Sequence, residues 1–266
     1  MSEMLKPVRN GSNMSRITPQ PPQFQMIRQE PKRRDLVVSR VERLSPAMIR
    51  IVLTGDALAD FSTHAPDDHV KLFVSDEDGA RVMRDFTPRR IDVQRRELTL
   101  DFVDHVGGPA ADWARSVKEG DAAAIGGPRG SRKLMSTVNS WLLIGDETVL
   151  PAIGRRLEEL DEHAIATSVV AVPGSADEQE ISTVARHTAL WVHRPLSDAH
   201  NPAPVIDVLK TLDWTPSTYI WIAAEAAVAR AVKMYVLEER GHSQDWIKSS
   251  GYWVKGSPGA SAKDLG

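Results

Sequence analysis

The sequence contains no cysteine. Disulfide bonds, cysteine-ligated zinc, iron–sulfur clusters and a thiol nucleophile are therefore excluded. No stretch approaches the ~18 consecutive apolar residues that a membrane-spanning helix needs. The N-terminal region also lacks the apolar segment of a secretory signal. We therefore expect a cytoplasmic protein that does not insert stably into a membrane.

The familiar signatures of catalytic and metal sites are missing as well. The chain has no P-loop, no GxGxxG, no HExxH and no GxSxG motif. The run "DDH" at 67–69 is a weak metal candidate, because adjacent strand residues point to opposite faces of a sheet. The formal net charge of -3 disfavours a nucleic-acid partner. Any cluster of arginines must then serve a local site.

The length of 266 residues allows one large domain or two ordinary ones, and the pattern along the chain favours two. Residues 1–33 are rich in Pro, Gln, Ser and Arg, which indicates a mostly disordered leader. Residues 34–135 give five or six short strands with turn signals between them, typical of an antiparallel barrel or sandwich. Within this region, "GGPAADWARSVKEG" predicts a short helix. Residues 136–266 alternate strands and helices, which predicts an α/β domain with a mostly parallel sheet.

Two strand ends in the second domain stand out, in "LLIGDETVLPA" and "IWIAAEAAVAR". Each strand runs through a turn of small residues carrying an acid, Glu147 or Glu225, into the start of a helix. Ligands of open α/β sheets bind beyond the carboxyl ends of the strands, and helix N-termini favour phosphate. Ordinary helix capping by the two acids explains the pattern equally well.

In the first domain, "RDFTPRR" at 84–90 precedes a strand, and "GGPAADW" at 107–113 opens the predicted helix. An arginine can hold a phosphate through two hydrogen bonds, and glycines at a helix start allow an anion to approach. Phe86 offers a face for a flat ring and Thr87 a hydroxyl, so the two segments together suit a dinucleotide. The alternative is that Arg89 and Arg90 only solvate a strand end while Phe86 belongs to the core.

Six blocks in order carry a family resemblance: "RDFTPRR", "DFVDHVGGPAADWA", "GGPRGS", "GDETVLPA", "AAEAAVAR" and "SGYW". They span nearly all of residues 35–254. Through them the chain resembles the siderophore-interacting protein family, which contains flavin-dependent ferric-siderophore reductases of the ferredoxin–NADP reductase-like group. The resemblance implies a six-stranded antiparallel barrel that binds FAD, followed by a nicotinamide-nucleotide domain.

The resemblance also implies a role for each matched position. Arg84 would bind the flavin phosphates, Phe86 would pack on the isoalloxazine, and Thr87 would form a hydrogen bond near the reactive ring. Further FAD contacts are expected from Arg89, Asp104, His105, Gly108, Pro109, Ala110 and Trp113. Contacts to the nicotinamide nucleotide are expected from Gly145, Asp146, Glu147, Thr148, Pro151 and Glu225, and contacts to the substrate from Lys71 and Arg129. No side chain is expected to act as acid, base or nucleophile, because the flavin carries the chemistry.

The sequence departs from the family pattern in three places. Phe86 stands where a tyrosine is usual, Ala111 where a phosphate-binding serine is common, and Ala224 where a glycine is common. The first change keeps a stacking surface but loses a hydroxyl. The second leaves more of the phosphate contact to backbone amides and Arg84. The third, a larger residue, narrows the space through which the nicotinamide approaches.

The expected function is therefore electron transfer from NAD(P)H through FAD to Fe(III) held by a siderophore, by a monomer. Arg155 and Arg156 could meet the 2′-phosphate of NADPH or could form a solvated helix face, and the resemblance favours NADPH over NADH. Two rival functions remain from the sequence: a flavin reductase that serves another acceptor, and a siderophore-binding protein without redox activity.

Overall fold

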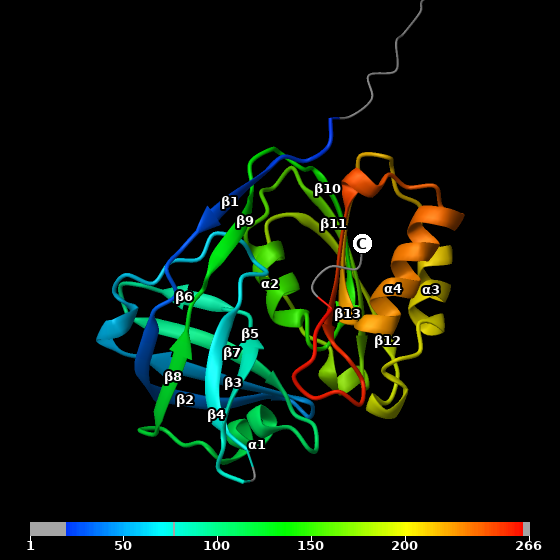
Figure 1. Cartoon of the computed structure of the whole chain (residues 1–266). Coiled ribbons are helices and arrows are strands. Elements are labelled where there is room, and N and C mark those ends of the chain that lie inside the picture. The colour runs from blue at the N-terminus through cyan, green and yellow to red at the C-terminus, as the bar shows by residue number, and fades with distance from the viewer. Residues whose placement is uncertain (1–19, 77, 263–266) are drawn as a thin grey trace, which may run out of the picture.

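The computed structural model describes residues 20–76 and 78–262 of the chain (Figure 1). Its first body is a seven-stranded antiparallel sheet with the order β5-β4-β8-β2-β3-β7-β6. The strands are β2 (Arg33–Ser45), β3 (Met48–Thr54), β4 (Val70–Ser75), β5 (Arg81–Phe86), β6 (Arg90–Asp92), β7 (Glu97–Val103) and β8 (Ala122–Gly126). Helix α1 (Pro109–Ser116) follows β7, as predicted.

The sheet must curl, because its two edge strands are neighbours in sequence. β5 and β6 lie at opposite edges and are joined only by residues 87–89. So short a link spans at most roughly 14 Å, so the two edges approach each other and the sheet rolls up. Alternate residues such as Leu98, Leu100 and Phe102 fill its interior. The predicted antiparallel barrel is confirmed, with seven strands instead of six because the short β6 is separate.

The second body is a five-stranded parallel sheet with the order β12-β11-β10-β13-β14. Its strands are β10 (Ser140–Asp146), β11 (Ile165–Val172), β12 (Arg186–His193), β13 (Tyr219–Glu225) and β14 (Ile247–Trp253). The α-helices are α2 (Leu150–Glu158), α3 (Ala203–Lys210) and α4 (Ala226–Met234), which continues as a π-helical turn at Tyr235–Glu239. Short 3-10 turns are η1 (Asp56–Leu58), η2 (Ser175–Asp177), η3 (Leu196–Asp198) and η5 (Gln244–Trp246). The predicted α/β architecture is therefore confirmed.

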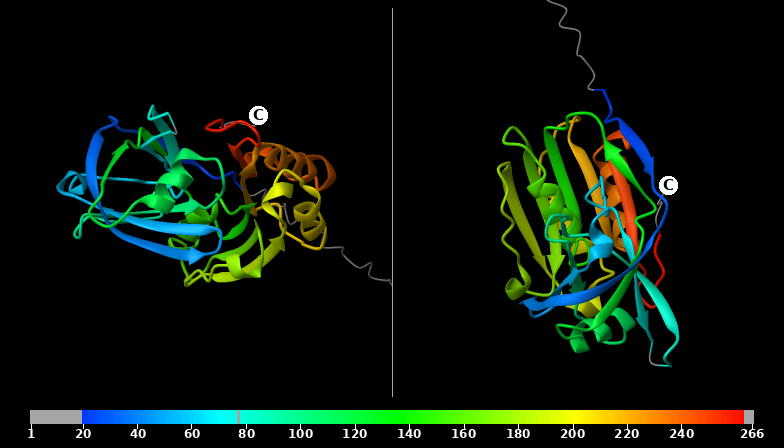
Figure 2. Two further views of the ribbon diagram at one scale, coloured as in Figure 1. Left: turned by 90° about the horizontal axis from the view of Figure 1, so that it is seen from below. Right: turned by 90° about the vertical axis from the view of Figure 1, so that its left-hand side faces the viewer.

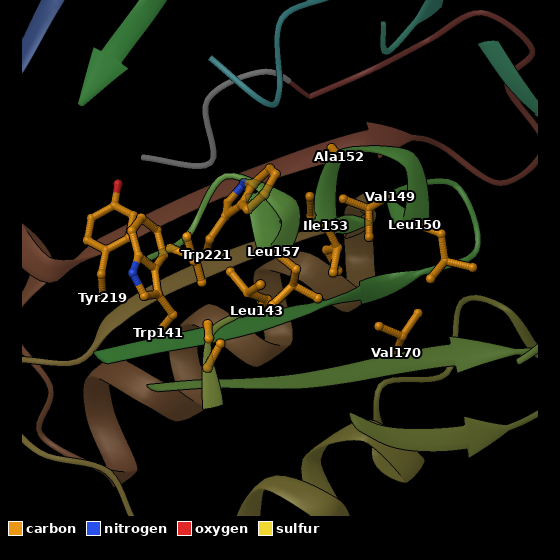
Figure 3. Close-up of a cluster of buried hydrophobic side chains, with 14 of the residues drawn as sticks. Trp141, Leu143, Val149, Leu150, Ala152, Ile153, Leu157, Val170, Tyr219 and Trp221 are labelled. Carbon is orange, nitrogen blue, oxygen red and sulfur yellow. The ribbon is translucent and has the colours of Figure 1, made fainter. Parts of the chain in front are cut away.

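Both faces of the parallel sheet are buried, so its strands are apolar without alternation. Leu142 and Ile144 of β10 belong to the core under α3 and α4. Trp141 and Leu143 of the same strand point to the opposite face, where α2 and the barrel residue Met48 complete the core (Figure 3). The two bodies lie side by side (Figure 2) and share this second core.

One part of the predicted leader is ordered. Residues 24–28 form β1 (Phe24–Arg28), which pairs antiparallel with β9 (Gly130–Leu134). The ring of Phe24 lies 5.8 Å from the ring of Tyr219 in β13, and the Arg132 guanidinium stacks over it at 3.9 Å. The prediction of disorder is wrong for this strand, because Phe24 finds an aromatic partner in the other domain. Residues 1–19 of the leader lie outside the described residues.

No helix in the described part of the chain is both long and apolar enough to cross a bilayer. The expected domain boundary at 135–136 falls between β9 and β10. β11 lies on one side of β10 and β13 lies on the other. The order of the strands in the sheet therefore reverses between β10 and β13. In an open α/β sheet this switch point opens a crevice at the carboxyl ends of the strands. By this rule a ligand of the sheet would bind next to the turns that carry Glu147 and Glu225.

A buried carboxylate joins the two bodies on the side of η2. The Oδ1 atom of Asp177 accepts hydrogen bonds from Ser45 Oγ at 2.7 Å and from the amide of Ala47 at 2.8 Å. All three residues are buried. The bonds tie the β2–β3 turn of the barrel to the loop after β11.

Replacing Asp177 with Ala is expected to lower the free energy of unfolding by about 1–3 kcal/mol, because two buried donors lose their acceptor. Chemical denaturation followed by tryptophan fluorescence measures the change. Asp213→Ala, which alters an exposed carboxylate instead, should leave the free energy within about 0.5 kcal/mol of wild type. An Asp177→Ala protein as stable as the wild type would contradict this role.

Candidate functional site

The end of β5 presents an aromatic platform. Phe86 is partly buried, and its ring centroid lies 4.3 Å from that of Phe102. Phe102 in turn lies 5.5 Å from Trp113 of α1. The three rings therefore connect the barrel core to the helix that follows β7. This packing fixes the exposed side of Phe86, which can accept a flat ring.

Arg84 lies two residues before Phe86, half-buried. Its Nη1 atom donates to the carbonyl of Met83 at 3.0 Å, and its guanidinium lies against Gly259 of the C-terminal segment. A Cβ at Gly259 would come within 3.2 Å of the Arg84 guanidinium. Within residues 20–76 and 78–262 no carboxylate pairs with Arg84, so its guanidinium is suited to bind an anionic ligand.

The N-terminus of α1 is a second anion-binding feature. Gly108 is its N-cap residue and Pro109 follows, and no side chain caps the helix. Its first amides are thus available to a phosphate. A Cβ at position 108 would lie 2.5 Å from the exposed His105 ring, which would have to move. Together with Arg84 and Phe86, this arrangement fits FAD, whose pyrophosphate and ring need those groups.

Asp104, which is expected to contact the flavin, forms ion pairs with two arginines. Its carboxylate accepts from Arg43 at 2.8 Å and from Arg115 at 2.6 Å. Burial acts to raise the pKa of Asp104, but the hydrogen bonds from Arg115 and Arg43 outweigh it and lower the pKa. The side chain thereby links the end of β7 to α1 and keeps its charge.

Arg89 reaches from the flavin segment to α2. Its guanidinium forms two hydrogen bonds with Glu158 of α2, at 2.8 and 2.5 Å. The structure therefore shows Arg89 in a contact with α2, and its contact to FAD stays a prediction. The alternative from the sequence does not describe Arg89, because it joins the two domains instead of solvating a strand end.

The turn after β10 is built around Asp146. Its Oδ1 atom accepts from the amide and hydroxyl of Thr148 at 2.9 and 2.5 Å. Its Oδ2 atom accepts from the amide of Glu225 at 2.8 Å and from Trp253 Nε1 at 3.0 Å. Gly145 is needed before it, because a Cβ would lie 2.0 Å from Val149 Cγ1 and 2.4 Å from the carbonyl of Ala223. Asp146 thus joins the carboxyl ends of β10, β13 and β14.

Glu147 is buried and pairs with Arg194, which follows β12, at 2.7 Å. Burial raises the pKa of Glu147 to about 7, helped by the neighbouring Asp146 carboxylate, and the attraction of Arg194 offsets only part of this. The pair links the ends of β10 and β12. Its carboxylate does not face the solvent side of the crevice.

Glu225 caps α4. Its Oε2 atom accepts from the amides of Ala227 and Val228 at 2.6 and 3.2 Å, and its Oε1 atom accepts from the amide of Lys255 at 3.2 Å. The capping interpretation is therefore correct for Glu225. All three acids are therefore engaged in contacts inside the protein, and the expected contacts of residues 145–151 and Glu225 to a nucleotide stay predictions.

Arg155 and Arg156 of α2 face the barrel and not the crevice. Arg156 stacks on Trp141 at 4.7 Å. Arg155 donates to Thr63 Oγ1 at 3.0 Å and is held by Glu159 at 2.8 Å. The two arginines therefore form neither a solvated helix face nor a group that faces the expected nucleotide site.

The two expected substrate residues lie on adjacent segments. Lys71 of β4 pairs in register with Gly126 of β8, and the exposed Arg129 follows three residues later. The Lys71 Nζ atom also lies 2.5 Å from Asp85 Oδ1. Lys71 is therefore partly neutralised, while Arg129 offers its charge to solvent.

Sequence reasoning missed Arg194, Trp253 and Glu158 as parts of the site. Arg194 could have been found, because it directly follows the apolar strand "TALWVH" and strand ends line the crevice. The pairing of Glu158 with Arg89 had no local signal, because the two residues are 69 positions apart.

Comparisons with known proteins agree with this architecture. The model of the siderophore-interacting FAD-binding domain matches residues 37–82 and 74–132, and that of the siderophore-interacting protein matches residues 138–256. The NADPH-dependent ferric-chelate reductase of Escherichia coli is 31% identical over 258 residues, covering 89% of this chain and 98% of that protein. The ferric vibriobactin reductase ViuB of Vibrio cholerae is 26% identical over 237 residues, covering 82% and 88%.

Solved structures show the same relationship. A siderophore utilization protein from T. fusca superposes with a TM-score of 0.83 at 30% identity, covering 90% of this chain and 98% of that one. The siderophore-interacting protein SipS from Aeromonas hydrophila gives 0.74 at 27% identity, covering 87% and 93%. The ferredoxin reductase of carbazole 1,9a-dioxygenase, at 17% identity and 0.64, covers 85% and 70% and shares the fold.

The raised pKa of Glu147 predicts a pH-dependent stability. The folded protein keeps a proton on Glu147 that the unfolded chain releases between about pH 4.5 and pH 7. The contribution of this residue to the free energy of unfolding therefore falls as pH rises through that window, by at most about 1.4 kcal/mol per pH unit.

Glu147→Gln cannot titrate, so the free energy of unfolding of the wild type minus that of the variant should decline from pH 4.5 to 7 and then level off. Denaturant titrations at several pH values measure it, with Glu162→Gln at an exposed position as the control variant. A difference independent of pH would show that Glu147 ionises normally.

Proposed function

The chain belongs to the siderophore-interacting protein family, and on that premise we propose that it is an NADPH-dependent ferric-siderophore reductase. Electrons would pass from NADPH through FAD to Fe(III) in a siderophore, with release of Fe(II). One NADPH supplies two electrons, so two Fe(III) become two Fe(II), and NADP⁺ and a proton are the other products. The proposal includes a monomeric, cytoplasmic protein.

The observation that carries the proposal is the contact between the flavin segment and α2, the helix that follows the nucleotide turn. Residues 87–89, directly after Phe86, lie against α2, and α2 begins in the turn after β10. A ring held on Phe86 and a nucleotide held at the switch point would therefore meet between the two bodies. A binding protein without redox activity would need no such second crevice.

This chain's residues would hold and orient both cofactors. Arg84 and the α1 amides would bind the flavin phosphates, assisted by His105, Gly108, Pro109 and Ala110. Phe86 and Trp113 would support the ring and Thr87 would donate a hydrogen bond near it. When bound, FAD supplies the step from hydride to single electrons that no amino-acid side chain can perform. The backbone of residues 145–151 would receive the nicotinamide nucleotide.

The chemistry of the substrate explains why reduction releases iron. Siderophores bind Fe(III) through hard oxygen ligands, and Fe(II) stands low in the order of affinities for such sites. Many ferric siderophores are anionic, so Lys71 and Arg129 would attract them by charge. The exposed position of Arg129 suits an effect on encounter more than on tight binding.

FAD binding tests the first half of the proposal. The purified protein mixed with FAD should acquire a flavin absorption spectrum, and anaerobic NADPH should bleach it. Arg84→Ala should weaken FAD binding about 10- to 100-fold, because a charge-assisted contact to phosphate is worth roughly 1.5–3 kcal/mol. Arg81→Ala on the same strand is the matched control. A protein that binds no FAD under any condition would sink the proposal.

Substrate binding tests the second half. The double variant Lys71→Ala, Arg129→Ala should raise KM for an anionic ferric siderophore about 3- to 10-fold, with little change for a neutral ferric complex. The effect should shrink as salt is added, because exposed charges are screened. Steady-state assays with both complexes measure it. An unchanged KM for the anionic complex would refute a substrate role for the two residues.

A further inference from the structure

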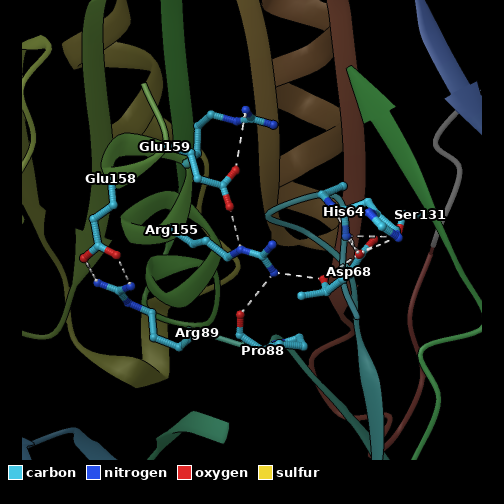
Figure 4. Close-up of polar contacts among 11 residues, drawn as sticks. His64, Asp68, Pro88, Arg89, Ser131, Arg155, Glu158 and Glu159 are labelled. Carbon is cyan, nitrogen blue, oxygen red and sulfur yellow. Dashed lines mark hydrogen bonds and ion pairs between the residues drawn. The ribbon is translucent and has the colours of Figure 1, made fainter. Parts of the chain in front are cut away.

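The loop that follows Phe86 is fastened to α2 by a two-point ion pair. Arg89 Nη1 and Nη2 donate to Glu158 Oε2 and Oε1 at 2.8 and 2.5 Å (Figure 4). The Arg89 side chain is only 12% exposed and that of Glu158 is 40% exposed. The parallel geometry of the two bonds fixes orientation as well as distance.

Gly154 makes room for this contact in the middle of α2. A Cβ at this position would lie 3.0–3.1 Å from Nη2, Cζ and Nε of Arg89. A glycine inside a helix costs roughly 1 kcal/mol relative to alanine. The helix thus gives up some of its own stability where Arg89 lies against its backbone.

A second arginine of α2 holds the same loop from its other side. Arg155 Nη1 reaches the carbonyl of Pro88 at 3.4 Å and Thr63 Oγ1 at 3.0 Å. Glu159 holds the Arg155 Nε atom at 2.8 Å. Pro88 lies between Thr87, expected at the flavin ring, and Arg89.

The network continues toward the substrate residues. The buried Asp68 accepts from Thr63 Oγ1 and Ser131 Oγ, both at 2.6 Å. Asp68 lies three residues before Lys71, and Ser131 lies two residues after Arg129. We call residues 87–89 the flavin loop. Connected polar contacts join this loop to α2, and join α2 to the two segments that carry Lys71 and Arg129 (Figure 4).

Water reaches the Glu158 end of this ion pair, and ion pairs that are screened by solvent contribute little to global stability, so stability alone does not explain this arrangement. We propose that Arg89, Glu158 and Arg155 are positioning residues that hold the flavin loop at a fixed distance from the nucleotide turn. They set the geometry of hydride transfer without touching the reacting atoms. This inference rests on the proposed function.

Glu158→Lys tests the inference, because it turns the attraction to Arg89 into repulsion at a partly exposed position that tolerates the change. Asp207→Lys is the matched control, since Asp207 forms an exposed ion pair with Lys210 on α3, away from the barrel. Glu158→Gln keeps the shape of the side chain but removes its charge. It should therefore change interdomain geometry and the rate of FAD reduction in the same direction as Glu158→Lys, but to a smaller extent.

The first readout is interdomain geometry. Because the chain has no cysteine, Arg95→Cys and Asp213→Cys allow one spin label to be placed on each body. The distance distribution between the labels, measured by pulsed electron paramagnetic resonance on the protein without cofactors, should broaden in Glu158→Lys. It should stay narrow in the wild type and in Asp207→Lys.

The second readout is the anaerobic rate at which NADPH reduces bound FAD, measured by stopped flow in the unlabelled proteins. Glu158→Lys should slow it about 10- to 100-fold at equal flavin content, since a displacement near 1 Å can cost about 100-fold. Asp207→Lys should match the wild type. If either readout for Glu158→Lys equals that of the wild type, the positioning role is wrong. If the wild type itself is not reduced by NADPH, the proposed function fails first.

Discussion

The structure depends on one packing constraint: the face of the parallel sheet turned toward the barrel cannot remain in water. Trp141, Leu143 and Trp221 project from this face. Helix α2 covers part of it, and Met48 of the first body and Phe24 of β1 cover more. Because apolar burial contributes about 25 cal/mol per Å², separating the bodies would expose much of a core. Their relative placement is therefore part of the fold.

This shared core explains how a site can exist between two bodies that bind different groups. The flavin segment lies on the barrel and the nucleotide turn lies on the sheet, and neither alone places a donor beside an acceptor. Packing brings the bodies together, and the directional contacts of Arg89 and Arg155 define how the flavin loop meets α2. Electron transfer needs such geometry more than it needs an acid or base, so the buried carboxylates serve other purposes.

Periodicity and turn residues predict the fold well. The buried strands, the helices and the change from antiparallel to parallel architecture follow from local patterns, as Gly120 and Gly241 at turn positions illustrate. The strands β1, β9 and β14 do not follow from local patterns, because each pairs with a strand that is distant in sequence. Phe24 has no apolar periodicity around it, and its place comes from the Tyr219 ring and the Arg132 guanidinium.

The sequence indicated which residue types make up the candidate site, but not which way their side chains point. Arg84 and the start of α1 offer groups that can bind an anion, and Phe86 offers an aromatic face, so their contacts to FAD stay predictions. Asp146, Glu147 and Glu225 occupy the predicted turns, yet their side chains point into the protein, and a sequence alone does not show which way a strand-end side chain turns. Arg89 and Arg155 gained their roles from contacts across the domain interface, which no local pattern reports.

The central claim is that this chain conducts electrons from NADPH to siderophore-bound iron through FAD. Its most direct test is an anaerobic reaction of the FAD-loaded protein with NADPH and several ferric siderophores, with a chelator trapping Fe(II). The account predicts about two Fe(II) trapped for each NADPH oxidised, and no Fe(II) when FAD is withheld. NADPH oxidation without Fe(II), or Fe(II) formed equally well without FAD, would contradict it.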